Sequence, residues 1–170
     1  DLEESLSPQR GQSTFSKHLA FIDPIGRRED IEAALNRLVV SLCTDLEQAD
    51  QGARRLVLTL YRADKSTGKV QISTSQPRRD PTHLSMLFRE KLEIIDPGLG
   101  VDAIVLSAPE NNPLKVQQTG LNTNFITEQT ENVIKLLDRL VSRLGSDNVT
   151  RLEPVERHLP ELAFREVSTV

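Results

Sequence analysis

The feature that most constrains the fold is a pair of neighbouring segments in which apolar residues recur at every second position. Residues 54–62 alternate leucine with other residues, and residues 69–75 alternate Val70 and Ile72 with polar residues. A short KSTG turn separates the two segments. A period of two is typical of half-buried β-strands, and a short connection joins antiparallel neighbours. The pattern therefore predicts an antiparallel β-hairpin with one buried face.

Amphipathic helices are predicted on both sides of this hairpin. Residues 28–49 carry apolar side chains every three or four positions and should end where Gly52 reverses the chain, and a second helix begins at Pro81. Short strands are expected at residues 15–22 and 101–108. The order strand, helix, strand, strand, helix, strand is a split βαβ arrangement. Right-handed crossovers then place both helices on one face of a four-stranded sheet, so the expected fold class is α+β (βαββαβ).

The remaining segments predict additions to this domain, which we expect to span residues 15–110. Residues 1–14 are polar and lack apolar periodicity, which is typical of a flexible linker, and residues 111–126 are rich in Asn and Gln and predict a second linker. Residues 127–170 predict a helical C-terminal extension with an extended tail. Its helix, residues 127–144, has a stripe of apolar side chains that we expect to pack against the domain: Val133, Leu136, Leu137, Leu140 and Leu144.

Charge is unevenly distributed along the chain. The net charge is −4, whereas dedicated nucleic-acid modules are more often basic. Residues 54–80 nevertheless contain seven basic residues and two acidic ones. A local basic stripe can bind phosphates even in an acidic chain. Aromatic residues make up 4% of the chain and Trp is absent, which argues against a site that stacks several bases on aromatic rings.

The predicted sheet has one face without helices, and the polar residues there form a candidate DNA-backbone site. Hydroxyl, amide and cationic groups on a flat face suit phosphate oxygens. Two adjacent arginines directly before the second helix would extend this face to its rim. The candidate DNA-backbone-binding residues are Arg55, Thr59, Lys69, Gln71, Ser73, Ser75, Arg78 and Arg79. The alternative is a sheet face that only contacts water, as antiparallel sheets often have.

No motif for catalysis, a cofactor or a metal ion is found in the sequence. His18, His83 and His158 fall in different segments without the close spacing of a metal-binding helix, so surface or packing roles are expected. Cys43 is the single cysteine and should behave as a small apolar residue of the first helix. We expect this sequence to have no enzymatic activity, and we expect a cytosolic setting because no run is long and apolar enough for a signal peptide or a membrane span.

Several segments carry a family resemblance. They are LAFIDPI, RRLVLTLYRADKSTGKVQISTSQPRRDP, IDPGLGVDAIVLSAP, NPLKVQQTGL and LEPVERHLPE. Together they resemble the C-terminal half of ImuB-type proteins, which are catalytically defective relatives of the Y-family translesion DNA polymerases. The resemblance implies that residues 15–110 form a little-finger-like domain that grips duplex or template-primer DNA with its open sheet. It also implies that palm, fingers and thumb domains precede Asp1.

The resemblance further implies protein partners. ImuB-type proteins bind the replicative sliding clamp through a short linker peptide, and Gln118 and Leu121 have the spacing of such a peptide, although Asn122 replaces the usual aromatic residue. A linker without a partner is the alternative. The C-terminal region would contact an ImuA-type accessory protein and an error-prone C-family polymerase. We therefore predict a non-catalytic DNA-binding adaptor in SOS mutagenesis; the alternative is an interaction scaffold that has lost DNA binding.

Overall fold

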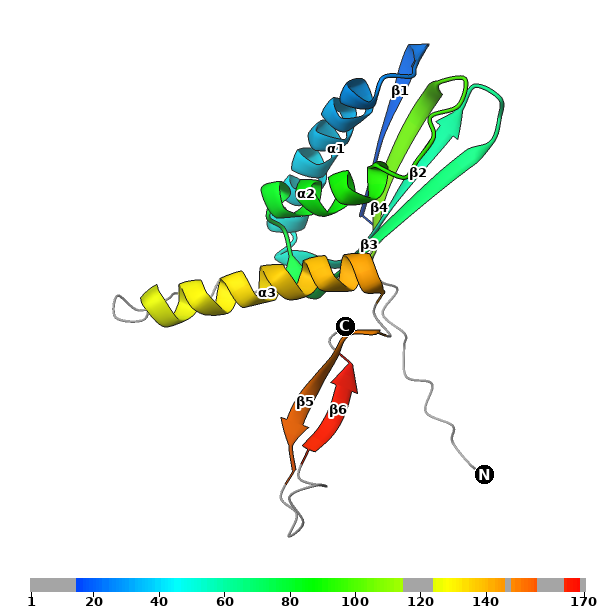
Figure 1. Ribbon diagram of the computed structural model, residues 1–170. Helices are drawn as coiled ribbons and strands as arrows, with labels where there is room; N and C mark the ends of the chain where they lie inside the picture. The colour runs from blue at the N-terminus through cyan, green and yellow to red at the C-terminus, as the bar shows by residue number, and fades with distance from the viewer. Residues whose placement is uncertain (1–14, 115–123, 146–147, 156–163, 169–170) are drawn as a thin grey trace, which may run out of the picture.

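The computed structural model describes residues 15–114, 124–145, 148–155 and 164–168 of the chain, with side chains in the third helix described from residue 131 onward. Figure 1 shows the arrangement of the elements. In chain order these are β1 (Phe15–Ile25), α1 (Arg28–Gln48), β2 (Gln51–Arg62), β3 (Thr67–Arg78), α2 (Pro81–Leu92), β4 (Val101–Pro113), α3 (Asn124–Leu144), β5 (Thr150–Pro154) and β6 (Phe164–Ser168).

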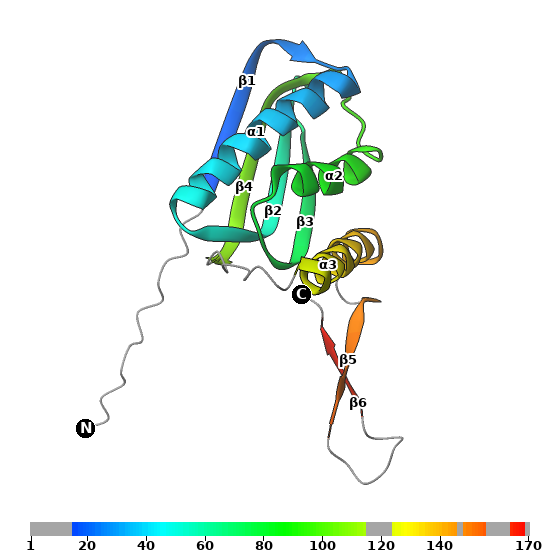
Figure 2. The same cartoon turned by 90° about the vertical axis from the view of Figure 1, so that its left-hand side faces the viewer.

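The first four strands form one sheet in the order β1-β4-β2-β3, in which every neighbouring pair is antiparallel. β1 and β2 are therefore parallel to each other with β4 between them, and β3 and β4 are parallel with β2 between them. Each of these pairs is joined by a helix, which is the split βαβ connection. Helices α1 and α2 lie on the same face of the sheet (Figures 1 and 2). The predicted α+β fold class is confirmed.

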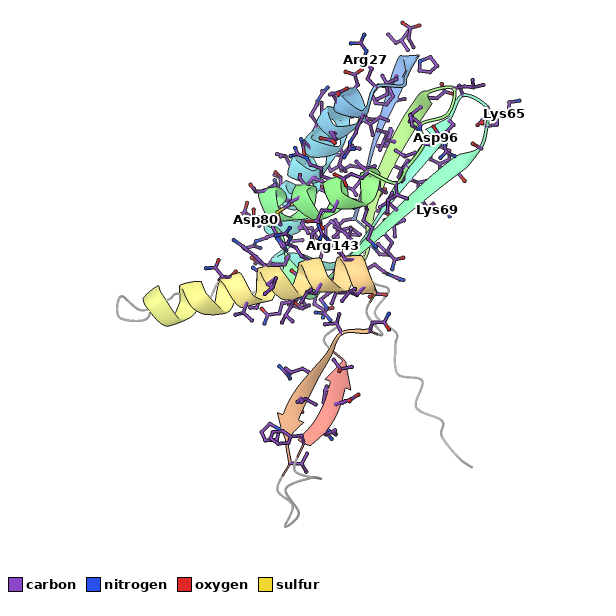
Figure 3. All side chains as sticks on the ribbon, in the orientation of Figure 1. Arg27, Lys65, Lys69, Asp80, Asp96 and Arg143 are labelled. Carbon is purple, nitrogen blue, oxygen red and sulfur yellow. The ribbon has the colours of Figure 1, made fainter. Side chains whose placement is uncertain are left out.

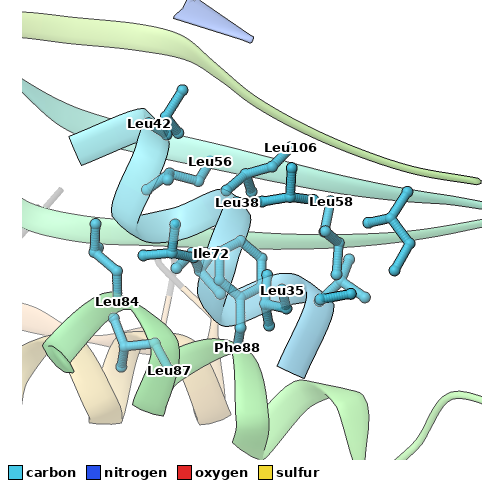
Figure 4. Packing of buried hydrophobic residues seen from close by; sticks show 14 of the residues in the cluster. Leu35, Leu38, Leu42, Leu56, Leu58, Ile72, Leu84, Leu87, Phe88 and Leu106 are labelled. Carbon is cyan, nitrogen blue, oxygen red and sulfur yellow. The ribbon is translucent and has the colours of Figure 1, made fainter. Parts of the chain in front are cut away.

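The core lies between this sheet and the two helices. Alternate residues of β2 point into it, and Leu56, Leu58 and Leu60 are fully buried. Helix α1 contributes a row of leucines, and α2 contributes Leu84, Leu87 and Phe88 (Figure 4). Full burial of one such side chain stabilises the folded state by roughly 1.5–3 kcal/mol. The apolar residues that alternate in the strand pattern and recur in the two helical patterns are therefore the ones that pack together in the core of the domain.

The chain reversal after α1 differs from the expectation. Asp50, not Gly52, adopts the left-handed backbone conformation, with φ 52°. Gly52 lies inside β2, where a Cβ atom would be 2.8 Å from the carbonyl carbon of Pro77 in β3. Glycine is thus required at this position for the close approach of two strands. Asp tolerates the left-handed conformation better than most residues, which explains why the turn does not need a glycine.

All four strands of the large sheet extend further than their sequence patterns predict. β1 continues to Ile25 through a register shift that follows Ala20, and β4 continues to Pro113. The reason for the longer β4 is its partner, because β2 begins at Gln51 and pairs with Pro113 at that end. The described domain therefore includes three residues that the sequence assigned to the linker.

Helix α3 packs against β3, at the edge of the sheet, and against α2. Figure 2 shows α3 beside the end of β3 and below α2. The tail forms a separate two-stranded antiparallel sheet in which Thr150 of β5 pairs with Ser168 of β6. Within the described ranges, none of the helices has the length and apolar character needed to span a lipid bilayer.

Candidate nucleic-acid interface

The face of the sheet opposite α1 and α2 brings five of the predicted residues together. In the register of β2 and β3, Thr59 lies opposite Lys69, and Arg55 lies opposite Ser73. Gln71 occupies the position between Lys69 and Ser73 on this face, opposite Val57. Lys69 and Gln71 are exposed, while the other three are half-buried. Figure 3 shows Lys69 on the side of the sheet away from the two helices. Leu56, Leu58 and Leu60 of β2 are buried in the core. Because successive side chains of a strand point to opposite faces, the residues between these leucines must lie on the open face.

Further polar residues extend this open face toward β1. Ser107 of β4 lies opposite Val57 of β2 and opposite Ser16 of β1, and His18 lies opposite Val105. The sequence analysis did not assign these residues because it compared alternating positions only within the hairpin. The alternation of apolar and polar residues in β1 could have identified Ser16 and His18, since Phe15, Leu19 and Phe21 pack against the core. The open face is therefore a mixture of hydroxyl, amide, cationic and small apolar groups across the whole sheet.

Arg55 is held on this face by an ion pair. Its Nη2 atom lies 2.7 Å from Oε1 of Glu110 on β4, and the two side chains are 37% and 49% exposed. Exposed ion pairs of this kind contribute about 0–1 kcal/mol. A phosphate group could therefore replace Glu110 as the partner of Arg55 at small cost.

Ser75 and Arg78 have a different environment near the end of β3, where the strand is irregular. Between Ser73 and Arg78 the strand advances five residues, while its partner advances only from Arg55 to Ala53. Burial still alternates as far as Ser75, because Ile72 and Thr74 are buried while Ser73 and Ser75 are half-buried. What changes at Ser75 is its neighbour, since α3 packs against β3. The backbone N and the Oγ of Ser75 both donate hydrogen bonds of 2.6 Å to Oδ1 of Asp138 on α3.

Arg78 is likewise turned toward α3. Its Nη1 atom donates a hydrogen bond of 2.7 Å to Oε2 of Glu131, and its side chain is only 12% exposed. The neighbouring Arg79 has a buried Nη1 atom for which the described residues supply no hydrogen-bond partner. The structure thus divides the predicted set: five residues lie on the open face, two are bound to α3, and Arg79 lies beside them at the start of α2.

Asp138 is the centre of the contact between α3 and the domain. It is fully buried, and its Oδ2 atom lies 2.8 Å from Nε2 of His83, which is itself 3% exposed. Burial raises the pKa of Asp138, but hydrogen bonds from His83 and Ser75 outweigh this effect and hold the pKa below its ordinary value. Asp138 is therefore a carboxylate that accepts three hydrogen bonds from two elements of the domain.

The expectation that the leucine stripe of α3 packs against the domain is wrong. The helix does pack, but it buries Ile134, Asp138 and Val141. Four members of the stripe remain substantially exposed, by 37–56%: Val133, Leu136, Leu140 and Leu144. Sequence reasoning placed the apolar side inward by the usual rule for surface helices. Nothing in the local pattern indicated that Asp138 would be the buried residue.

The other residues singled out in the sequence have simpler positions. Cys43 is buried in the core, and burial raises the pKa of its thiol to about 12, so it is protonated at neutral pH. His18 lies on the open face, while His158 lies outside the described residues. Gln118 and Leu121 also lie outside them, so the clamp-binding motif stays a prediction. Among the residues that the structure describes, no group of three or more His, Cys, Asp or Glu side chains is arranged to hold a metal ion.

Comparison with known proteins gives related sequences for this fold. Residues 13–121 match the impB/mucB/samB family C-terminal domain. The chain is 32% identical over 158 residues to protein ImuB from two strains of Caulobacter vibrioides, an alignment that covers 93% of the chain and 34% of the relative. The chain therefore spans about a third of the length of these curated relatives. The resemblance to ImuB-type proteins read from the sequence is confirmed.

Two solved structures of polymerase domains are also similar to this chain. An insertion ternary complex of Dbh DNA polymerase is similar with a TM-score of 0.50 at 10% identity, covering 60% of this chain and 29% of that chain. A complex of the β-clamp processivity factor and the little finger domain of PolIV gives a TM-score of 0.49 at 20% identity, covering 64% of this chain and 98% of that chain. The family match extends over more than half of the chain, from before β1 to beyond β4. The chain belongs to the impB/mucB/samB family and contains its C-terminal domain.

Proposed function

We propose that the open face of the sheet holds the backbone of duplex or template-primer DNA, as the non-catalytic part of a translesion-synthesis protein. The observation that carries this proposal is a sheet face that none of the described helices covers, on which five polar residues lie in adjacent positions of two paired strands: Arg55, Thr59, Lys69, Gln71 and Ser73. Such groups donate hydrogen bonds to phosphate oxygens, which fixes the position of a protein on DNA without reading its sequence.

The charge of this face supports the proposal. The cationic groups Arg55 and Lys69 lie on it, and Glu110, the acidic partner of Arg55, forms an exposed pair that is easily exchanged. Membership of the impB/mucB/samB family supports a role linked to translesion polymerases. The chain spans about a third of the length of its curated relatives. The role of the whole protein in translesion synthesis is therefore proposed as well.

Salt-dependent DNA binding tests this proposal. A fluorescently labelled duplex is titrated with the chain at several salt concentrations, and the logarithm of the affinity is plotted against the logarithm of the salt concentration. Each neutralised phosphate contributes a slope of about 0.9. Lys69→Gln should weaken binding and reduce the slope by about one unit. Arg37→Gln removes one positive charge from the exposed side of α1 and should leave the slope unchanged.

The rival function is an interaction scaffold that does not bind DNA. It predicts no duplex binding even at low salt, or binding that both variants reduce equally. Either result would overturn the proposal. The measurement separates the two functions because Arg37 and Lys69 carry the same charge, whereas Lys69 lies on the open face of the sheet and Arg37 on α1, which covers the other face.

The adaptor role is proposed in two parts. Gln118 and Leu121 would bind the sliding clamp, with the amide forming hydrogen bonds and the leucine entering an apolar groove. Replacing both with Ala should abolish co-elution with the clamp, whereas unchanged co-elution would place the binding segment elsewhere. The ImuA-type protein and the C-family polymerase are proposed partners of the C-terminal region. The exposed leucines of α3 support this part, because large exposed apolar surfaces are typical of interaction sites.

A further inference from the structure

We propose that α3 competes with the DNA backbone for the hydrogen-bond donors at the end of β3. In the docked state, the carboxylates of Asp138 and Glu131 bind Ser75 and Arg78, which belong to the predicted DNA-backbone site. DNA would gain these donors only when α3 leaves. The inference rests on the proposed function and adds a regulatory step to it.

The contact at Ser75 leaves no donor for a phosphate. A serine has one backbone N–H and one hydroxyl O–H to donate. Both are directed to Oδ1 of Asp138 at 2.6 Å. A carboxylate and a phosphate are both anionic oxygen acceptors that form short hydrogen bonds with N–H and O–H donors. Asp138 therefore occupies the position that a phosphate oxygen would need in order to bind Ser75.

The contact of Glu131 with Arg78 keeps a phosphate away from the guanidinium group. The side chain is 12% exposed when Glu131 binds it, so a phosphate cannot approach the guanidinium from solvent without displacing α3. Its Nε and Nη2 atoms are buried, and the described residues give them no hydrogen-bond partner. Arginine binds phosphate best through two parallel hydrogen bonds, whereas Glu131 receives only one. A phosphate would thus use the guanidinium more fully than α3 does.

The interface that holds α3 is suited to reversible release. Its buried apolar residues are Ile134 and Val141, next to the buried pair of Asp138 and His83. The Nδ1 atom of His83 is buried without a hydrogen-bond partner among the described residues, so even this pair is incompletely satisfied. Buried polar pairs add little net stability compared with apolar contacts.

The ion pairs between α3 and α2 are partly exposed. Arg139 and Arg143 both form ion pairs with Glu90, at 3.1 Å and 3.0 Å, and the arginine side chains are 45% and 65% exposed. Exposed ion pairs are weak and are weakened further by salt. These ion pairs therefore add little to the buried contacts of Ile134, Asp138 and Val141 that hold the helix.

The test compares two double variants of the full chain in the duplex titration. Asp138→Ala with Glu131→Ala removes both carboxylates of α3 that bind β3. Asp102→Ala with Glu29→Ala removes the same charge from exposed positions on β4 and α1. We expect the first variant to bind duplex more tightly than the unchanged chain, because only the unchanged chain must break the contacts of α3 before Arg78 reaches a phosphate. Both proteins should show the same slope, since the same phosphates are neutralised in the two complexes. The second variant should not show the gain in affinity of the first.

Amide hydrogen exchange gives the second measurement. Saturating the unchanged chain with duplex should accelerate exchange along α3, because a helix released from its packing surface is marginally stable. Equal affinity for the unchanged chain and the α3 variant, or exchange in α3 that is unchanged on duplex binding, would overturn the competition and leave the proposed function intact. Absence of duplex binding by every protein would overturn both.

Discussion

Replacing Asp138 with Ala should release α3 while leaving the four-stranded domain folded. The substitution removes a buried carboxylate that accepts hydrogen bonds of 2.6, 2.6 and 2.8 Å. The amide of Ser75 and the imidazole of His83 would lose their partner, and breaking a buried pair of this type costs about 3–5 kcal/mol. The buried apolar side chains of α3, Ile134 and Val141, contribute roughly 3–6 kcal/mol together before the entropy of ordering the helix is subtracted. The loss is therefore comparable to the whole free energy of docking.

Amide exchange and urea unfolding together measure this effect. Exchange should become faster along α3 and at Ser75, whose amide donates a hydrogen bond to Asp138. The free energy of unfolding of the sheet and of α1 and α2 should change by less than about 0.5 kcal/mol, as for substitutions away from the core. Asp138→Asn is the matched control, because its amide oxygen can still accept from Ser75. Unchanged protection of α3, or a loss of about 3–5 kcal/mol in the cooperative unfolding of the domain, would refute the reasoning.

Three further predictions concern the domain and its contact with α3. Leu58→Ala removes a fully buried core side chain and should lower the free energy of unfolding by about 2–5 kcal/mol in a urea titration, whereas Val40→Ala, at a 53% exposed position, should have little effect. Gly52→Ala should destabilise the domain by about 1–3 kcal/mol in the same titration, because the new Cβ atom would lie 2.8 Å from the backbone of β3. Protonation of Asp138 should weaken α3 docking. Its folded-state pKa is lowered from an ordinary value of 3.8, so its contribution is fully present above that pH and is lost as the pH falls through the lowered value, which exchange in α3 would report.

The α+β fold could be predicted because its signals are local. The leucines of β2 recur with a period of two and those of α1 with a helical period, and both sets are buried in the core. The handedness of crossovers then leaves few ways to arrange the elements. The same parity correctly placed Arg55, Thr59, Lys69, Gln71 and Ser73 on the uncovered face. Predictions of this kind need no knowledge of distant contacts.

The environment of Ser75 and Arg78 could not be predicted because it depends on pairing between distant segments. The bulge between Ser73 and Arg78 in β3 is defined by its register with β2, which lies outside the local pattern. Glu131 and Asp138 are more than fifty residues away from the side chains that they bind. The leucine pattern of α3 also predicted the wrong side of the helix to be buried. Hydrophobic periodicity cannot show that the buried side will carry Asp138, whose carboxylate accepts three hydrogen bonds from distant residues.

The position of α3 beside β3 has a consequence for the solubility of the chain. β3 is the last strand of its sheet, and such a strand presents unpaired N–H and C=O groups that can pair with a strand of another molecule. Asp138 takes up one of these groups, the amide of Ser75, and the body of α3 covers the same part of the strand. A chain with α3 displaced therefore exposes a strand that invites intermolecular β-sheet formation. Any ligand that releases α3 must also cover this strand to keep it from pairing with a strand of another molecule.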